Sequence, residues 1–118
     1  MKNQSLLYRL GFALTGLQST WRTEHSFKTH VVATVAVVGV LLWLEPAPLW
    51  WAIAALTIGF VLAAEVFNTA VEGLADHLHP EQHPAIRAVK DCAAGAVLVA
   101  SIAALGVAAA FVYDVVLG

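Results

Sequence analysis

The chain has 118 residues, of which 60% are hydrophobic and only 12% are charged, and its formal net charge is −2. A soluble domain of this length has too little interior to bury so much apolar surface, so the composition excludes an ordinary soluble globular protein and favours an integral membrane protein. One cysteine, Cys92, excludes an intrachain disulfide. We expect a single domain embedded in the bilayer, spanning residues 1–118, with no nucleic-acid partner.

The first predicted element is an amphipathic helix over residues 4–22. Leucines and a tryptophan recur there at spacings of three and four, and they form one apolar stripe: Leu6, Leu7, Leu10, Leu14, Leu17 and Trp21. Such a helix lies on the membrane surface with its apolar face among the headgroups. Two uses stay open: the helix covers a functional site, or it only anchors the chain and packs against the other helices.

Three later segments approach the roughly 20 apolar residues that span a hydrocarbon core. These predicted spans are residues 27–44, 46–71 and 92–113. The link between the first two is so short that they must form an antiparallel hairpin. Trp43, Trp50 and Trp51 flank this link, as is typical of the aromatic belt at a membrane interface. The predicted fold is therefore all-α, with three transmembrane helices and an N-terminal amphipathic surface helix.

The basic residues predict the orientation of these spans. Four precede the first span and two lie between the second and the third: Lys2, Arg9, Arg22, Lys28, Arg87 and Lys90. The short link at 45–49 and the C-terminal end carry none. The positive-inside rule therefore puts the N-terminus and the 77–91 loop in the cytoplasm, in a multi-pass protein of the inner membrane.

The second span carries polar side chains where lipid or protein interior is expected. At about 100° per residue they fall within one narrow sector of the helix: Glu65, Asn68, Thr69, Glu72 and Asp76. Charges at membrane depth cost roughly 3 kcal/mol or more each unless they are neutralised or paired. A divalent metal, a proton or a basic partner must therefore accompany them, and clustered hard oxygen ligands suit Mg²⁺. The alternative is an ion network that only packs helices, or, for Glu72 and Asp76, a place among the headgroups.

Four stretches together are similar to a known family. They are "GLQSTWRTEHSFKTH" at 16–30, "EVFNTAVEGLAD" at 65–76, "EQH" at 81–83 and "AVKDCAAGAVL" at 88–98. In these residues and their spacing, the chain resembles the small integral-membrane lipid kinases of bacteria from about residue 9 to its end. These are the prokaryotic diacylglycerol kinases and the related undecaprenol kinases.

The resemblance implies a role for each matching position. Glu65 corresponds to the general base that takes the proton of the lipid hydroxyl, and Glu24 and Glu72 correspond to the carboxylates that hold Mg²⁺ on ATP. The implied ATP-binding residues are Glu24, Asn68, Glu72, Glu81, Gln82, His83, Lys90 and Asp91. The implied lipid-contacting residues are Gln18, Ser19, Thr20, Trp21, Ser26, Phe27, Lys28, Thr29, His30, Trp43, Leu44, Glu45, Pro46, Glu65 and Ala94. The family is a homotrimer whose active sites are shared between subunits, with the site on the cytoplasmic side.

The resemblance also implies ATP-dependent phosphorylation of a membrane lipid alcohol, with diacylglycerol converted to phosphatidic acid as the first expectation. Undecaprenol is the alternative, because the "AAGAVL" wording at 93–98 looks closer to undecaprenol kinases. Two positions depart from the family pattern. Phe12 replaces a tyrosine that contacts ATP in some members, and Ala94 replaces a serine beside the lipid.

Two other classes of function stay open on the residues alone. A proton- or cation-conducting oligomer would line a pore with the stripe from Glu65 to Asp76, but such a pore needs acids across the whole membrane. Here the acids stop at mid-span, and residues 92–113 contain no charge. A structural membrane subunit would instead pair its charges with another protein, and a change at Glu72 would then disturb assembly.

Overall fold

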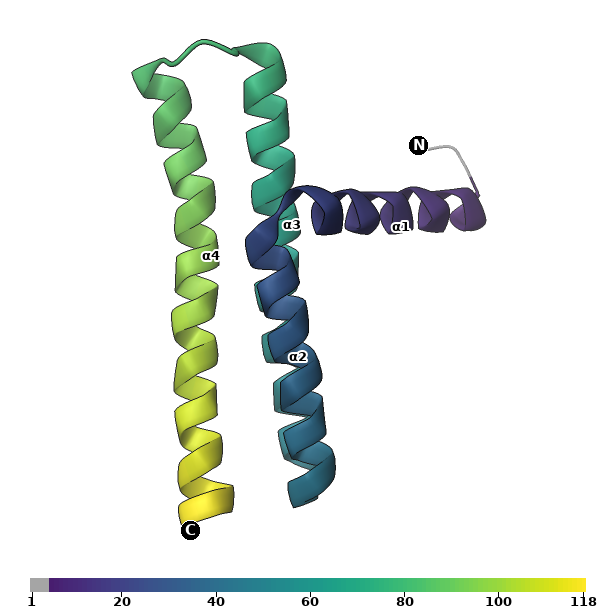
Figure 1. Cartoon of the computed structure of the whole chain (residues 1–118), viewed down its shortest axis with the longest axis vertical. Helices are drawn as coiled ribbons and strands as arrows, with labels where there is room; N and C mark the ends of the chain where they lie inside the picture. Colours follow the sequence, from purple (N-terminus) through teal and green to yellow (C-terminus); the bar gives the residue numbers. More distant parts are fainter. Residues whose placement is uncertain (1–4) are drawn as a thin grey trace.

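The computed structural model describes residues 5–118, and every element in that range is helical. The elements are α1 (Leu6–Thr23), α2 (His25–Leu44), α3 (Pro48–Leu78), α4 (Pro84–Phe111) and a closing π-helical turn, η1 (Val112–Leu117). The helices α2, α3 and α4 run up and down side by side, while α1 projects sideways from the bundle (Figure 1). The basic residue Lys2 and Gln4, the first residue of the predicted surface helix, lie outside the described residues.

Three helices are long and apolar enough to cross a membrane, which confirms the predicted membrane fold: α2, α3 and the continuous α4–η1. At about 1.5 Å per residue, the 20 residues of α2 make about 30 Å, which matches a hydrocarbon core. The 31 residues of α3 make about 46 Å, so α3 is longer than that core. Its extra length carries the polar stripe.

Prolines and local caps define where the helices begin. Pro48 is in the first turn of α3, and Pro84 is in the first turn of α4, where the missing amide hydrogen is not needed. His83 caps α4 by accepting a hydrogen bond from the amide of Ala85 at 3.1 Å. Glu45 ends α2 in the left-handed conformation (φ 48°), which turns the chain toward α3.

Packing within one chain is sparse and is centred on α3. The helix α4 packs most extensively on α3, and α2 and α1 also contact α3. Among the described residues, the buried side chains are Thr20, Phe27, Leu41, Val61, Glu65 and Ala75. Most apolar side chains of the bundle are exposed, as expected where lipid or another subunit covers them.

One polar contact ties the ends of the bundle that lie farthest from α1. The Trp50 Nε1–H on α3 donates a hydrogen bond to Asp114 Oδ2 at 2.9 Å, and the Trp50 ring meets Phe111 edge-on at 5.2 Å. A hydrogen bond and a ring contact therefore join the start of α3 to the C-terminal end of the chain.

We expect Trp50→Phe to lower the free energy of unfolding by about 1 kcal/mol, because it keeps an aromatic ring and removes one hydrogen bond. Denaturant unfolding in detergent micelles would measure this loss. Trp43→Phe is the matched control and should leave stability unchanged, because Trp43 is 79% exposed. Equal losses in both variants would contradict a specific contact at Trp50.

Candidate active site

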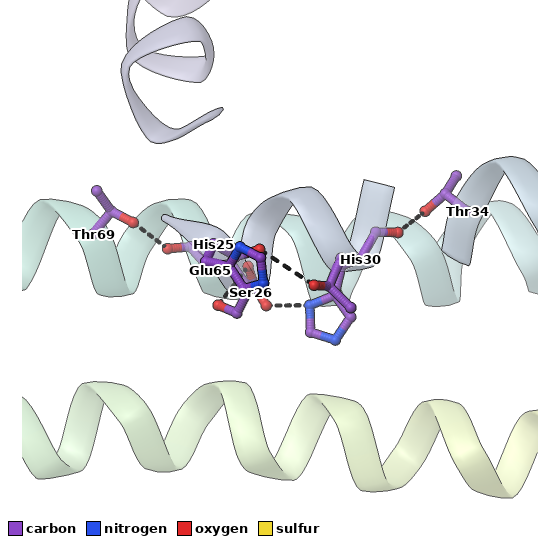
Figure 2. Close-up of polar contacts among 7 residues, drawn as sticks. His25, Ser26, His30, Thr34, Glu65 and Thr69 are labelled. Carbon is purple, nitrogen blue, oxygen red and sulfur yellow. Dashed lines mark hydrogen bonds and ion pairs between the residues drawn. The ribbon is translucent and has the colours of Figure 1, made fainter. Parts of the chain in front are cut away.

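The most buried charged residue among the described residues is Glu65, in the middle of α3, with 3% of its surface exposed. Two side chains from the start of α2 meet its carboxylate, as Figure 2 shows. His30 Nδ1 contacts Oε1, and the Ser26 hydroxyl lies 3.5 Å from Oε2. A carboxylate accepts hydrogen bonds only, so the imidazole N–H and the hydroxyl are the donors. This is a carboxylate kept inside a helix bundle by polar partners.

The helices place these partners by their regular spacing. Ser26 and His30 are four residues apart on α2, so both side chains point to the same face of that helix, toward α3. Thr34 follows one turn later and donates its hydroxyl to the carbonyl of His30 at 2.8 Å. Thr69 donates its hydroxyl to the backbone carbonyl of Glu65 at 3.0 Å, so that hydroxyl does not serve the carboxylate.

Glu24 lies at the elbow between α1 and α2. Its backbone is extended (φ −112°, ψ 109°), and its amide donates to the carbonyl of Thr20 at 2.9 Å, which ends α1 and lets α2 start in a new direction. Burial raises the pKa of the Glu24 carboxyl, and the negative charges of Glu72 and Glu65 raise this pKa further. The elbow therefore brings a fourth carboxylate close to the polar stripe of α3, beside those of Glu65, Glu72 and Asp76.

An unsatisfied amide adds to this oxygen-rich region. Asn68 lies on α3 between Glu65 and Glu72, and its Oδ1 is buried without a hydrogen-bond partner among the described residues. Such an orphan oxygen indicates a missing donor, cation or water. Within residues 5–118 no three acidic, histidine or cysteine side chains gather as a complete metal site. Glu24, Glu72 and Asn68 nevertheless fit Mg²⁺, which needs only one or two carboxylates when phosphate and water complete its shell.

The polar side chains at the α3–α4 loop form a second part of the site. Lys90 on α4 pairs with Asp76 at the end of α3, and Arg87 pairs with Asp91 one turn along α4 at 3.1 Å. The loop between these helices borders an open pocket of about 380 Å³. Its lining includes Glu81, Gln82, His83, Arg87 and Lys90. The pocket therefore combines basic groups with polar loop residues at one end of the bundle.

The predicted lipid-contacting residues divide into two groups in one chain. Gln18 to Trp21 and Ser26 to His30 surround the elbow near Glu65, where the Lys28 ammonium lies 5.7 Å from the centre of the Trp21 ring. Trp43, Leu44, Glu45 and Pro46 lie at the opposite end of α2. About 28 Å of helix separates Ser26 from Glu45, so a single chain does not bring the two groups together. Ala94 is exposed on α4, one turn beyond Lys90.

Two contacts at this site join different helices: His30 meets Glu65, and Lys90 pairs with Asp76. The sequence offers few basic partners for the acids, and Lys90 is one of them. No pattern in the sequence distinguished His30 from the other four histidines as the partner of Glu65.

The comparisons with known proteins agree on one family. The sequence profile described as Prokaryotic diacylglycerol kinase matches residues 11–112. The chain is 39% identical over 84 residues to an undecaprenol kinase of Bacillus subtilis, covering 71% of this chain and 68% of that protein. It is 35% identical over 102 residues to a diacylglycerol kinase of Synechocystis sp., covering 86% of this chain but only 58% of that protein. It is 28% identical over 95 residues to a diacylglycerol kinase of Escherichia coli, covering 80% of this chain and 78% of that protein.

An all-helical membrane fold, a buried acid on α3 and these matches together define a multi-pass membrane lipid kinase. The chain belongs to the prokaryotic diacylglycerol kinase family. Membership in a kinase family implies an ATP-dependent reaction on a lipid in the membrane.

Proposed function

We propose that this protein transfers the γ-phosphoryl group of ATP to the hydroxyl of a membrane lipid alcohol, with Glu65 as the general base. The burial of Glu65 beside the elbow is the observation that carries this proposal. In the reaction, Glu65 takes the proton of the lipid hydroxyl, the hydroxyl oxygen bonds to the γ-phosphorus, and the bond from that phosphorus to the β–γ bridging oxygen breaks. ADP leaves with those electrons. Positioning and charge neutralisation supply most of the catalysis in such a transfer.

Glu24 and Glu72 would hold Mg²⁺ on the phosphates, and the unpartnered Oδ1 of Asn68 lies in the same region. When bound, the ion offsets the negative charge that develops on the phosphate oxygens. Burial raises the pKa of the Glu24 carboxyl, and the charges of Glu72 and Glu65 raise it further, so these three acids lie near one another. Their mutual repulsion would fall when MgATP arrives.

The nucleotide would lie at the α3–α4 loop. Lys90 is the point charge for the phosphates, with Asp91 beside it, and Glu81, Gln82 and His83 line the pocket in which the adenosine fits. Lys90 pairs with Asp76, so a nucleotide that binds Lys90 would displace this ion pair. Asp76 is 61% exposed, and a pair as exposed as this one is weak enough to be displaced.

We expect Lys90→Gln to raise the KM for ATP about tenfold, because it removes one charge-assisted hydrogen bond to phosphate. Steady-state kinetics at varied ATP and fixed saturating lipid would measure this. The KM for the lipid should stay the same, since Lys90 lies at the nucleotide end of the site. A rise in the lipid KM with an unchanged ATP KM would contradict the assignment.

The lipid would enter along the elbow, in contact with Gln18 to Trp21 and Ser26 to His30. The second predicted lipid group, Trp43 to Pro46, and Ala94 belong to the proposal through the family resemblance. A homotrimer with shared sites would cover much of the apolar surface that one chain leaves exposed. We propose that all of residues 1–118 form one such domain in the inner membrane, with the site facing the cytoplasm, as the basic residues indicate.

Diacylglycerol is the first candidate substrate, because the family profile and two of the three relatives above carry that name. Undecaprenol is the second candidate, favoured by the 39% identity to the undecaprenol kinase. The two alcohols differ in the group that carries the hydroxyl and in the number and length of their chains. The residues around Glu65 do not by themselves select one of them.

A phosphoryl-transfer assay on purified protein in mixed micelles tests the proposal. Radiolabelled ATP would be offered with diacylglycerol or with undecaprenol, each with Mg²⁺ and with the ion chelated. We expect one of the two lipids to become labelled. This labelling should require Mg²⁺. Transfer to neither alcohol would overturn the substrate proposal, and full activity after chelation would overturn the metal assignment.

A further inference from the structure

The two oxygens of the Glu65 carboxylate have different surroundings. Oε1 is in close contact with His30 Nδ1, whereas Oε2 has only the Ser26 hydroxyl at 3.5 Å, the outer limit of a hydrogen bond. Among residues 5–118 no other side chain donates to this carboxylate. Oε1 is therefore held by the His30 ring, whereas Oε2 could exchange its weak Ser26 partner for the hydroxyl of an incoming lipid.

We propose that His30 is a positioning residue for phosphoryl transfer: its Nδ1–H holds Oε1 of Glu65 and so directs Oε2 toward the lipid hydroxyl. This inference rests on the proposed role of Glu65 as the base. It gives His30 a role that differs from the lipid contact implied by the family resemblance. A hydrogen bond to one oxygen fixes the rotation of the carboxylate, which has no other firm partner.

The surroundings of His30 suit such a role. Its backbone is tied to Thr34, and its side chain is 30% exposed, so the ring lies at the edge of the bundle and not in its centre. His30 also borders the apolar groove of about 410 Å³ that runs along α2, α3 and α4, whereas Glu65 does not line that groove. The His30 ring therefore contacts the carboxylate and also borders an apolar space, and within residues 5–118 it is the one ring that offers an N–H to Glu65.

The test compares two variants of His30 with a matched histidine elsewhere. His30→Ala should lower kcat about ten- to a hundredfold, the effect expected when a reacting group is displaced by about 1 Å. KM for ATP should stay within about twofold, because His30 does not approach the nucleotide pocket. His30→Asn should recover most of kcat, because its amide nitrogen is bonded to Cγ as Nδ1 is. His77→Ala, at the exposed end of α3, should leave kcat unchanged.

Ser26→Ala provides an internal comparison on the other oxygen. Because its hydroxyl is 3.5 Å from Oε2, we expect a smaller loss of kcat than in His30→Ala. Equal kcat in His30→Ala and the unmodified protein would overturn the inference. So would a failure of His30→Asn to exceed His30→Ala, since that result would assign His30 another function.

A spectroscopic readout covers the case in which His30→Ala does not fold. In protein labelled with ¹⁵N-histidine, one ring should keep its proton on Nδ1, and its signals should shift in Glu65→Gln and be absent in His30→Asn. A His30 ring protonated only on Nε2 would overturn the inference. The proposed function fails separately: if Glu65→Gln keeps its activity, the base assignment is wrong whatever the ring signals show.

Discussion

Glu65→Gln abolishes phosphoryl transfer, in our expectation, while ATP binding stays intact. Glutamine has nearly the same shape as glutamate and can still accept a hydrogen bond from His30, so the bundle should fold as before. It cannot take a proton from the lipid hydroxyl. Loss of a general base lowers kcat by about 10²- to 10⁴-fold. Glu65 is the only acid whose carboxylate is almost fully buried among the described residues.

Two measurements check this expectation on the same preparation. Transfer of label to the lipid gives kcat, and titration with a fluorescent ATP analogue gives the affinity for nucleotide. Asp114→Asn is the matched control, because it makes the same acid-to-amide change at the far end of the bundle, where Asp114 meets Trp50. Full activity of Glu65→Gln would contradict the assignment. So would equal losses of activity in Glu65→Gln and Asp114→Asn.

The second large effect is expected at Glu72. Glu72→Gln should raise the Mg²⁺ concentration needed for half-maximal activity at least about tenfold, because one of two proposed carboxylate ligands becomes a weaker amide ligand. The Glu24 carboxyl should respond as well, since the charge of Glu72 is one of the causes that raise its pKa. Removing that charge should bring the pKa of Glu24 closer to its ordinary value.

A Mg²⁺ titration of lipid phosphorylation, together with light scattering of the protein in micelles, distinguishes the kinase from the two other classes of function. A kinase site predicts a changed Mg²⁺ requirement and an unchanged assembly. A structural subunit predicts a changed assembly, and a conducting oligomer predicts ion flux into liposomes without ATP. Either of these last two results, with a normal Mg²⁺ requirement, would refute the proposed role of Glu72.

The sequence predicts the membrane fold well because its signals are local. The mostly apolar run that ends α2 is enough to identify this helix, and the 3.6-residue period is enough to place Glu65, Asn68 and Glu72 on one face of α3. The full length of the helices is a separate matter. The sequence predicts a third span from residue 92, where the apolar run begins, and the helix that contains it begins earlier, at Pro84, with a proline in its first turn and His83 as its cap.

The contacts between helices are the part that the sequence leaves open. Periodicity defines the faces of α2 and α3 but not their rotation or axial shift relative to each other, and these two quantities decide which side chain meets Glu65. The family resemblance named the acids and their roles, which stay predictions. It gave His30 a contact with lipid and did not indicate its contact with Glu65.

The length of α2 relates the protein to the thickness of the membrane around it. Because α2 is about 30 Å long and begins beside Glu65, the depth of this proposed base in the membrane should depend on the thickness of the surrounding hydrocarbon. A thicker bilayer would draw Glu65 below the level of the headgroups, and a thinner one would lift it into water. We therefore expect the enzyme to be most active in bilayers whose hydrocarbon thickness matches the length of α2.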